Sequence, residues 1–274
     1  MIGGRLLELN EVTIPYKQGE PVRICGLGDI HWGSVACDVK ALDRAINYIV
    51  KNNVYVVLMG DLLDCINYDD KRFDPDVIVP EGRNHLKNLP QWQADTLCEK
   101  LSKIPDDLLI GCHSGNHEQK INSFDVTEYI CKNLNVKNYG RFAWTRIRFE
   151  RTSGESKHTE VFKMISFHPE GNSSTDPGKL KKIMDVYNNY RADLYLMAHV
   201  HAIMINRKSS CTIPQKGKLE VIDESHGLMI TGSFLKTMVE GVTTYSERKV
   251  YPPVKCGIST FAIYPEERRI HLSC

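Results

Sequence analysis

The stretch Leu27-Gly28-Asp29-Ile30-His31-Trp32-Gly33 follows an apolar run from Val22 to Leu27 that is typical of a buried strand. Residues two apart in an extended segment point to the same side of the backbone. The carboxylate of Asp29 and the imidazole of His31 are therefore expected to converge on one point at the carboxyl end of this strand. An oxygen and a nitrogen donor in that position are a common beginning of a metal-binding α/β site. Because Asp-x-His also occurs by chance, its meaning depends on how the other strands end.

The composition is that of an ordinary globular protein. The 274 residues are 42% hydrophobic and 25% charged, and the formal net charge is +1. This length fits one large domain or two small ones. No internal repeat or interdomain linker is visible, so we expect a single domain over residues 1–274. A dedicated nucleic-acid binder is usually far more basic, although a local basic groove is compatible with a neutral chain.

The cysteine pattern and the apolar runs bear on the compartment. Nine cysteines are scattered along the chain, and no two of them form a Cys-x-x-Cys pair. This argues against a disulfide framework and against a structural zinc site. The N-terminus lacks a basic segment followed by an apolar core, and no apolar run approaches the length of a membrane span. We therefore expect reduced thiols, a cytoplasmic protein and no membrane partner.

Helix and strand patterns alternate in the first half of the chain. Asp38 is a plausible N-cap for a helix with apolar positions at helical spacing from Val39 to Ile49. The run 54–59 is continuously apolar and β-branched, which is typical of a strand buried on both faces. Strand, helix and buried strand together predict a βαβ unit and hence a parallel pair. Helical faces at 94–101 and 126–134 enclose a third short strand at 108–110.

The second half has mostly β texture. Alternating patterns predict strands at 142–149 and 160–167, joined by a polar turn at 152–158, and a buried strand at 194–197. Asp176-Pro177 is a good N-cap and N1 pair for the helix between them. Further strands are expected near 203–206, 218–222, 227–231, 257–264 and 269–272, and residues 1–21 read as an edge strand or lead-in. We therefore expect one domain with two sheets.

Residues 66–91 interrupt this rhythm. Aspartates, prolines and a glycine mark a long irregular segment, and loops of this length in a compact domain tend to be functional or disordered. The segment is a possible insertion that faces the substrate, with Arg72, Arg83 and His85 available to a phosphate or base. A solvated surface loop with incidental cations is an equal alternative.

Polar clusters follow five of the predicted strands. They are Asp29 and His31, Asp61 and Asp64, Asn116 and His117, His168, and finally His199 and His201. Each cluster lies beyond the carboxyl end of a strand, where open α/β sheets bind ligands. Singly each has an ordinary explanation, such as a turn pair or a left-handed backbone at Asn116. Their joint placement favours a metal site, and oxygen and imidazole donors without a thiolate suit Mn²⁺, Fe, Zn²⁺ or Ni²⁺.

The ordered set resembles the fingerprint of the calcineurin-like metallophosphoesterases. That fingerprint runs Asp-x-His, Gly-Asp-x-x-Asp, Gly-Asn-His-Asp or -Glu, a lone His, and Gly-His-x-His. This chain reads Asp29-Ile30-His31, Gly60-Asp61-Leu62-Leu63-Asp64, Gly115-Asn116-His117-Glu118, His168, and Ala198-His199-Val200-His201. The resemblance covers residues 22 to 230. Two positions depart from it, since Ala198 replaces the usual glycine and Pro169 follows the lone histidine where glycine is usual.

The resemblance implies an α/β metallophosphoesterase fold, in which two mixed β-sheets pack face to face and are flanked by helices. It also implies two divalent metal ions, with Mn²⁺ favoured and Fe, Zn²⁺ or Ni²⁺ as alternatives. Asp29, His31 and His201 would hold the first metal. Asn116, His168 and His199 would hold the second, and Asp61 would bridge the two. Two cations about 3.5–4 Å apart repel each other, which a shared carboxylate and a shared hydroxide relieve, and that bridging hydroxide is the implied nucleophile.

Two further residues receive catalytic roles from the resemblance. His117 would face the substrate and stabilise the transition state or protonate the leaving oxygen. Asp64 would orient the His117 ring, and the competing interpretation of Asp64 is a carboxylate at a helix start. Glu118 is expected in an outer shell or at the surface rather than as a ligand.

The cations and remaining histidines give little guidance on the substrate. Lys179, Lys181 and Lys182 are expected on the solvated face of a helix start, and His113 and His226 in the core or at the surface. Arg141 and Arg146 are five apart and so lie on opposite faces of a regular strand, which leaves no single basic stripe. Trp32 either lines the site or packs beneath it.

The expected substrate is a phosphoester, either a nucleotide or nucleic-acid phosphodiester or a phosphomonoester. Stand-alone chains of this kind resemble phage and bacterial family members with distant similarity to the catalytic domain of Mre11-type nucleases. A phage origin would place the protein in the host cytoplasm. An Mre11-like DNA exo- or endonuclease is one alternative, although the near-neutral charge and the lack of a visible capping domain weaken it. A non-catalytic metal-binding scaffold is the other, and the intact set of metal positions with His117 favours an enzyme.

Overall fold

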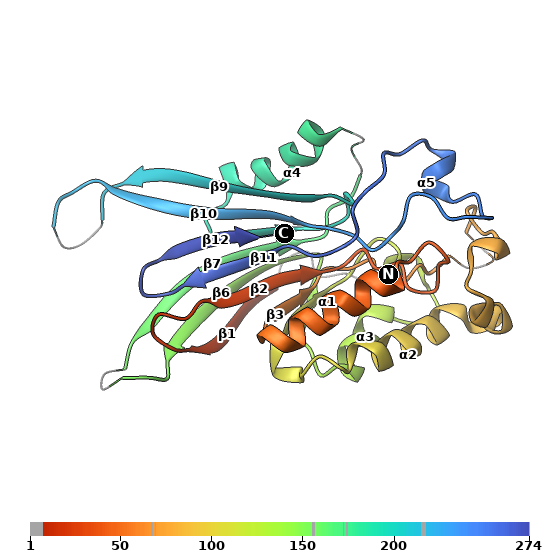
Figure 1. Cartoon of the computed structure of the whole chain (residues 1–274), viewed down its shortest axis with the longest axis horizontal. Helices are drawn as coiled ribbons and strands as arrows, with labels where there is room; N and C mark the ends of the chain where they lie inside the picture. The colour runs from red at the N-terminus through yellow and green to blue at the C-terminus, as the bar shows by residue number, and fades with distance from the viewer. Residues whose placement is uncertain are drawn as a thin grey trace.

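Two six-stranded β-sheets pack face to face in residues 8–273, which the computed structural model describes except at positions 67, 69, 155–156, 172, 174 and 215–217 (Figure 1). The first sheet has the order β1 (Glu8–Tyr16), β6 (Phe142–Arg151), β7 (Thr159–Phe167), β8 (Leu194–Met197), β10 (Ile222–Thr231) and β9 (Ile203–Thr212). The second has the order β12 (Arg269–Ser273), β11 (Thr260–Tyr264), β2 (Val22–Leu27), β3 (Tyr55–Leu58), β4 (Leu109–His113) and β5 (Asn138–Gly140). Both sheets mix parallel and antiparallel pairs. The predicted fold class is confirmed.

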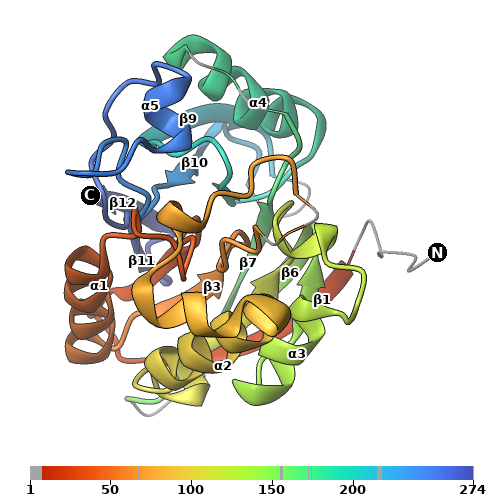
Figure 2. The ribbon, with the colours of Figure 1, turned by 90° about the vertical axis from the view of Figure 1, so that its right-hand side faces the viewer.

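Helices cover the outer face of each sheet (Figure 2). The second sheet is covered by α1 (Val39–Asn52), α2 (Leu89–Leu101) and α3 (Val126–Asn133), and the first by α4 (Asp176–Asn189). Apolar side chains such as Leu42 and Ile46 of α1 pack on the second sheet, and Ile183 of α4 packs on the first. A third apolar cluster fills the space between the sheets. Both faces of each sheet are therefore buried over much of their area, which explains the continuous apolar runs in the central strands.

The predicted elements of the first half agree closely with the structure. Strand β2 has the predicted bounds, and it pairs in parallel with β3 as the βαβ pattern requires. The side chain of Asp38 caps α1 by accepting a hydrogen bond from the Ala41 N–H. Strand β1 is an edge strand of the first sheet and runs parallel to β6. Segment 66–91 contains two 3₁₀ helices, Pro75–Val77 and Pro80–Asn88, before α2 begins.

Three details differ from the prediction. The N-cap of α4 is Thr175 rather than Asp176, because Thr175 has an extended backbone and its side chain accepts from the Gly178 N–H, while Asp176 is already helical. The strand predicted near 227–231 begins earlier, at Ile222, as β10, and β9 extends to Thr212. The strand predicted near 218–222 is wrong, because residues 218–221 lie before β10 and outside the sheet. Residues 223–226 stay in the strand because the antiparallel β9 pairs with them. Positions 1–7, 67, 69 and 155–156 of the predicted lead-in, segment and turn lie outside the described residues.

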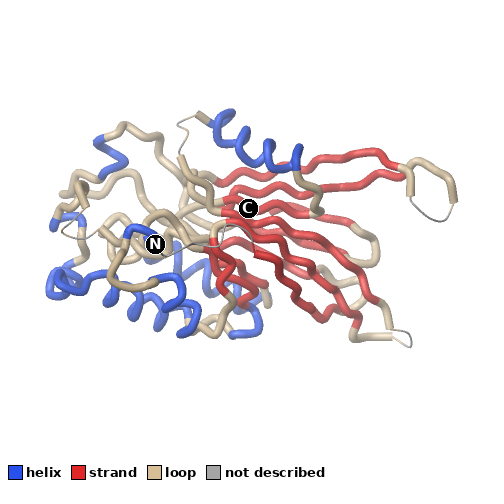
Figure 3. Tube along the Cα trace, turned by 180° about the vertical axis from the view of Figure 1, so that it is seen from behind, coloured by secondary structure: helices blue, strands red, loops and turns tan. Residues whose placement is uncertain are grey.

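The loops that follow the strands gather at one end of the sandwich. Figure 3 shows the strands filling one side of the molecule, and most helices and long loops lying at the other. One of these loops runs from β10 to β11 through residues 232–259 and contains the short helix α5 (Tyr245–Arg248). Within the described ranges, no helix combines the length and apolar character that crossing a bilayer requires.

Candidate metal centre

All seven predicted metal ligands meet at this end of the sandwich. Asp29 and His31 follow β2, Asp61 follows β3, Asn116 follows β4, His168 follows β7, and His199 and His201 follow β8. Strands β2, β3 and β4 are parallel within one sheet, and β7 and β8 are parallel within the other. Their carboxyl ends therefore bring residues from distant parts of the sequence to one edge.

One group consists of Asp29, His31 and His201. The Nε2 atoms of His31 and His201 are 3.2 Å apart, and His201 Nε2 is 3.5 Å from Asp29 Oδ1. Two nitrogen ligands that each lie about 2.1 Å from a metal ion are about 3.0–3.4 Å apart. The spacing therefore fits three ligands of one cation.

The other group consists of Asp61, Asn116, His168 and His199. His168 Nε2 lies 3.2 Å from His199 Nδ1, 3.3 Å from Asn116 Oδ1 and 3.4 Å from Asp61 Oδ2. Burial by itself would raise the pKa of Asp61, but His168 and His199 hold it well below its usual value. Burial likewise opposes the charge on His168, yet the Asp61 carboxylate raises the pKa of His168 to about 9. The second group therefore stabilises a positive charge among its side chains. Like the first group, it consists of oxygen and imidazole donors.

Backbone groups fix the orientation of these ligands. The His199 N–H donates to Asp29 Oδ2 at 2.8 Å, and the His117 N–H donates to Asp61 Oδ1 at 2.9 Å. The ring of His168 is held by Nδ1, which lies 2.7 Å from the Met59 carbonyl. Asp29 Oδ1 is buried and accepts no hydrogen bond from any described residue. Orientation of ligands by a second layer of hydrogen bonds is typical of metal sites, and a buried carboxylate oxygen left without a donor fits a cation.

The backbone of the ligands is strained. Five of the seven have a positive φ: Asp29 (47°), His31 (51°), Asp61 (46°), His199 (77°) and His201 (46°). Residues other than glycine rarely adopt a positive φ, and each one lowers the stability of the fold by about 1–3 kcal/mol. Asp29 and His31 therefore converge through a sharply turned backbone, and not through the extended one that the sequence suggested. Asn116 does not have a positive φ, so the left-handed interpretation of this residue is wrong.

Gly115 and Glu118 support Asp61 from behind. A Cβ atom at Gly115 would lie 2.0 Å from the Asp61 nitrogen, so only glycine fits there. The buried carboxylate of Glu118 accepts hydrogen bonds from the N–H groups of Asp61, Leu63 and Gly115 at 3.1, 3.0 and 2.9 Å. Burial and the Asp61 charge raise the pKa of Glu118 to about 7. Glu118 thus lies in an outer shell, one of the two places predicted for it.

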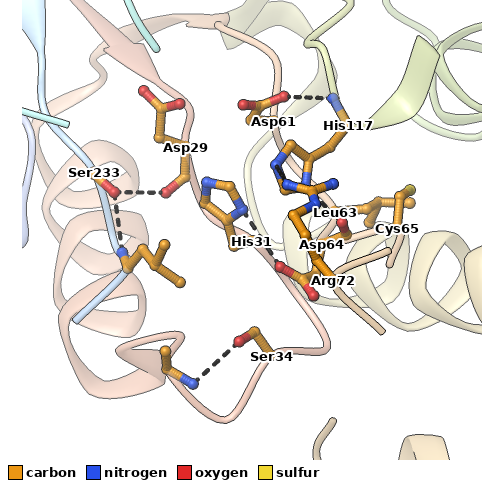
Figure 4. A network of polar contacts seen from close by, with 12 residues as sticks. Asp29, His31, Ser34, Asp61, Leu63, Asp64, Cys65, Arg72, His117 and Ser233 are labelled. Carbon is orange, nitrogen blue, oxygen red and sulfur yellow. Dashed lines mark hydrogen bonds and ion pairs between the residues drawn. The ribbon is translucent and has the colours of Figure 1, made fainter. Parts of the chain in front are cut away.

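His117 and Asp64 lie beside the ligands, and Figure 4 shows their contacts. His117 Nδ1 is 2.5 Å from the backbone carbonyl of Asp64, and Nε2 is 3.2 Å from an Arg72 nitrogen. A carbonyl only accepts and a guanidinium only donates, so the proton of His117 is on Nδ1 and Nε2 accepts from Arg72. Burial and the nearby charge of His31 lower the pKa of His117 to about 4, in agreement with a neutral ring.

Asp64 contacts His117 differently from the prediction. Its carbonyl holds the His117 ring, while its carboxylate lies 3.5 Å from Nδ1 of His31. No helix begins at Asp64, so the competing helix-start interpretation is wrong. One residue therefore orients two histidines, one through its backbone and one through its side chain.

A cavity of about 240 Å³ opens in front of the two ligand groups, and we call it the metal cavity. Besides the ligands and His117, its lining includes Arg72 and Lys179. Lys179 was expected on a solvated helix face, but the first turn of α4 lies against the cavity, and the Lys179 side chain is buried with Nζ 3.6 Å from Asp176 Oδ1. The structure thus places two cationic side chains, Arg72 and Lys179, in the lining of the metal cavity.

The rest of the lining comes from residues 232–259, which the sequence did not single out. Leu235, Thr237, Ser246, Tyr251, Pro252 and Val254 all line the metal cavity. The segment is held to the site because Ser233 Oγ and the Phe234 N–H both donate to the Asp29 carbonyl, at 3.0 and 2.9 Å. Its length and its lack of periodicity, the signals that marked 66–91, were present here as well.

Several other candidates prove to be structural. The Arg83 guanidinium donates to the Ile78 and Asp76 carbonyls, and His85 stacks on Trp92. Trp32 donates to Thr96 Oγ1 of α2 and packs against the helices, which places it beneath the site. His113 is buried, with Nε2 2.7 Å from Ser166 Oγ, in the core as expected. The three arginines of β6, and Arg141 directly before this strand, are each paired with a glutamate: Arg141 with Glu170, Arg146 with Glu11, Arg148 with Glu150, and Arg151 with Glu266.

Oxygen and imidazole donors lie at strand ends and face an open cavity that is also lined by the cationic side chains of Arg72 and Lys179. This arrangement on a β-sandwich is typical of a metal-dependent hydrolase. The model of the calcineurin-like phosphoesterase family matches residues 22–202, and the chain belongs to this family. It is therefore a metal-dependent phosphoesterase. A comparison with curated proteins finds no match. The matched region contains every predicted ligand but not residues 232–259, so part of the cavity wall lies outside it.

Proposed function

We propose that this chain hydrolyses a phosphoester bond of a nucleotide or nucleic acid at a centre of two divalent cations, with Mn²⁺ as the favoured metal. The observation that carries the proposal is the joint lining of the metal cavity. Two ligand groups lie at its floor, and the cationic side chains of Arg72 and Lys179 lie in its walls. Cations in the walls match the negative charge of a phosphate ester.

The two ligand groups fit one cation each. Asp29, His31 and His201 would hold the first, and Asn116, His168 and His199 the second, with Asp61 between them. Bound cations would polarise the phosphoryl oxygens and lower the pKa of the attacking water. The raised pKa of His168 supports this assignment. The Asp61 carboxylate stabilises a positive charge on the His168 ring, and a bound cation would supply that positive charge in place of the proton.

Arg72 and His117 act on the substrate in this proposal. Asp70 fixes the Arg72 guanidinium, since its carboxylate accepts from Nε at 3.0 Å and from a terminal nitrogen at 2.6 Å. These two hydrogen bonds orient the guanidinium so that its other terminal nitrogen lies toward His117. Arg72 supplies a permanent positive charge beside the neutral imidazole of His117. A bound phosphate would accept the Arg72 N–H that His117 Nε2 accepts in this structure. Released from Arg72, His117 Nε2, which carries no proton in this structure, would have to bind one before it stabilises the transition state or protonates the leaving oxygen.

The proposal also covers the whole chain. Strand β1 pairs with β6, and β11 pairs with β2, so strands from the first and last parts of the described chain join the two sheets. We therefore treat residues 1–274 as one domain. The eight cysteines in the described ranges are free thiols, which supports a reducing cytoplasm as the place of action.

A substrate panel tests the proposal. The purified protein is assayed with Mn²⁺, and with chelator, on phosphomonoesters, linear and cyclic nucleotide diesters, and single- and double-stranded DNA. We expect metal-dependent cleavage of at least one nucleotide or nucleic-acid substrate. Cleavage confined to phosphate esters without a nucleoside would overturn the substrate class. Binding of two metals without cleavage of any substrate would support a non-catalytic scaffold.

A further inference from the structure

A second cavity, of about 360 Å³, lies beside the metal cavity, and we call it the side cavity. The two cavities share five lining residues: Asp64, Ile66, Arg72, Leu235 and Ser246. The two cavities are therefore adjacent, and the same five side chains lie between them. A substrate whose scissile phosphate lies over the metal ligands can therefore extend into the side cavity.

The side cavity is strongly cationic. Its lining contains five cationic side chains and two carboxylates, whereas the whole chain has a formal net charge of only +1. The cations are Lys71, Arg72, Lys236, Arg248 and Lys249, and the carboxylates are Asp64 and Asp74. Lys71 and Lys236 form no ion pair with any residue that the structure describes. Among the described residues, no carboxylate is paired with either lysine, and such a positive charge attracts an anion.

The walls of the side cavity are tied together. Arg248 donates to Asp74 Oδ2 at 2.7 Å, which links the loop before the first 3₁₀ helix to α5. The Lys236 N–H donates to the Ala36 carbonyl at 2.8 Å, and the Val35 N–H donates to the Val77 carbonyl at 2.9 Å. The cationic groups are thus presented by loops with defined backbone contacts, and the depression exists before any ligand binds.

An exposed aromatic ring lies on the same loop. Tyr68 is 58% exposed, and its ring centroid is 4.7 Å from that of Phe73. Lys71 and Arg72 lie between these two residues in the sequence. Proteins that bind single-stranded nucleic acid combine a cationic groove with aromatic rings on which bases stack. Cationic residues and an exposed ring on one loop therefore favour a ligand that carries both phosphates and bases.

We infer that the side cavity binds a second phosphate of the substrate, linked to the ester that is cleaved, and that the substrate is a short single-stranded oligonucleotide. The inference rests on the proposed function, which it makes more specific. Lys71 and Lys236 hold the second phosphate, and Arg72 lies between the two phosphate positions. Tyr68 is on the loop that carries Lys71 and Arg72 but lines neither cavity, so it stacks on a base that extends beyond the side cavity. A nucleoside polyphosphate also carries linked phosphates, and the experiment separates it from an oligonucleotide.

The experiment measures kcat/KM with Mn²⁺ for four substrates: bis(4-nitrophenyl) phosphate, a dinucleotide with one phosphodiester, a trinucleotide with two, and a nucleoside triphosphate. For the wild type we expect the trinucleotide to exceed the dinucleotide by about tenfold, mainly through KM. Lys236→Ala and Lys71→Ala should each reduce this ratio by about threefold or more, and should flatten the salt dependence of KM. Lys181→Ala is the matched control, because Lys181 pairs with Asp185 on the exposed face of α4, and its ratio should equal the wild-type ratio.

Substitutions of Tyr68 provide an independent test of base stacking. Tyr68→Ala should raise KM for the trinucleotide, and Tyr68→Phe, which keeps the ring, should restore it. Thermal unfolding of each variant verifies that it is folded. A trinucleotide no better than the dinucleotide, or lysine variants with the wild-type ratio, would overturn the inference, and so would a preference for the nucleoside triphosphate alone. If no ester is cleaved, the proposed function fails, and the Kd of a fluorescent trinucleotide for wild type, Lys236→Ala and Lys181→Ala then decides whether the side cavity binds it.

Discussion

The metal cavity and the side cavity share a wall, yet they are built from different parts of the chain. The floor of the metal cavity consists of buried carboxylates and histidines at the ends of sheet strands, held by backbone hydrogen bonds. The side cavity is lined by three loop segments, 34–36, 64–77 and 235–249, which carry five lysines and arginines. Hydrogen bonds between these loops and the exposed Arg248–Asp74 ion pair connect its walls. Positions at sheet ends are rigid and suit chemistry, whereas loops vary readily and suit recognition.

The two regions also differ in what their folding costs. The metal cavity keeps five ligands in a left-handed backbone and places several ionisable groups out of water. Such strain persists only where the surrounding structure determines it. Most cations of the side cavity remain in contact with water, so their cost is small. Changes in the metal cavity should therefore remove activity on every substrate, and changes in the side cavity should alter only the choice among substrates.

The largest effect is expected from Asp61→Asn. Asp61 supplies the only carboxylate of the second ligand group, and its Oδ2 faces His168 and His199. Loss of this charge should reduce metal content below two ions per chain and lower kcat/KM by more than the factor of about 100 seen for outer-shell changes. Metal analysis and steady-state kinetics measure both. Asp185→Asn, on the exposed face of α4, is the control, and an Asp61→Asn protein with two metals and normal turnover would refute the assignment.

His117→Ala should separate chemistry from metal binding. His117 is beside Asn116 but contacts Asp64 and Arg72, so its removal leaves every predicted ligand in place. We expect unchanged metal content and a kcat reduced by a factor of about 10²–10⁴, the usual contribution of an acid–base group. Full activity in this variant would contradict the role given to His117.

Gly115→Ala should disturb the metal cavity without changing a ligand. The added Cβ would lie 2.0 Å from the Asp61 nitrogen and 2.2 Å from its Oδ1, so the loop or Asp61 must move. Overpacking of this kind costs about 1–3 kcal/mol, and we expect a lower unfolding temperature together with weaker metal binding. Gly241→Ala tests whether crowding is the cause, because no atom lies within 4 Å of a Cβ there; it adds backbone strain instead, since Gly241 has a φ of 78° and Gly115 has no positive φ. Equal metal affinity in both variants would argue against the crowding of Asp61.

Arg72→Ala should give the smallest of these effects on the reaction. Arg72 lines both cavities, so kcat/KM should fall by about tenfold for single-phosphate and extended substrates alike. Lys at this position should recover part of the loss, since it keeps the charge but not the planar guanidinium. Arg83→Ala is the matched control from the same segment, because Arg83 only binds backbone carbonyls. A loss confined to extended substrates would move Arg72 entirely to the side cavity.

The sequence was sufficient to predict the central strands and to place the seven candidate ligands after strands, but it did not predict β5. Apolar periodicity located β2 and β3, and ligands at the carboxyl ends of parallel strands are neighbours by geometry alone. The sequence also indicated that the arginines near β6 form no common basic stripe, and the structure pairs each with a glutamate.

Features that depend on tertiary contacts could not be predicted in this way. The left-handed backbone at Asp29 and His31 follows from contacts with Asp61 and its neighbours, since the N–H groups of both residues donate to carbonyls of the β3 loop. Lys179 is buried because α4 lies against the metal cavity, which helical periodicity does not reveal. Residues 232–259 close the cavity through hydrogen bonds to the Asp29 carbonyl, more than 200 positions away in the sequence.

In the proposed function, hydrolysis depends on two cations held by these ligands. The most direct test removes all metal from the protein, adds Mn²⁺ back in known amounts, and follows cleavage of a nucleotide diester. We expect no activity without metal and a plateau at two equivalents per chain, as two separate ligand groups require. Activity that survives metal removal, or that reaches its plateau at one equivalent, would contradict the proposed function.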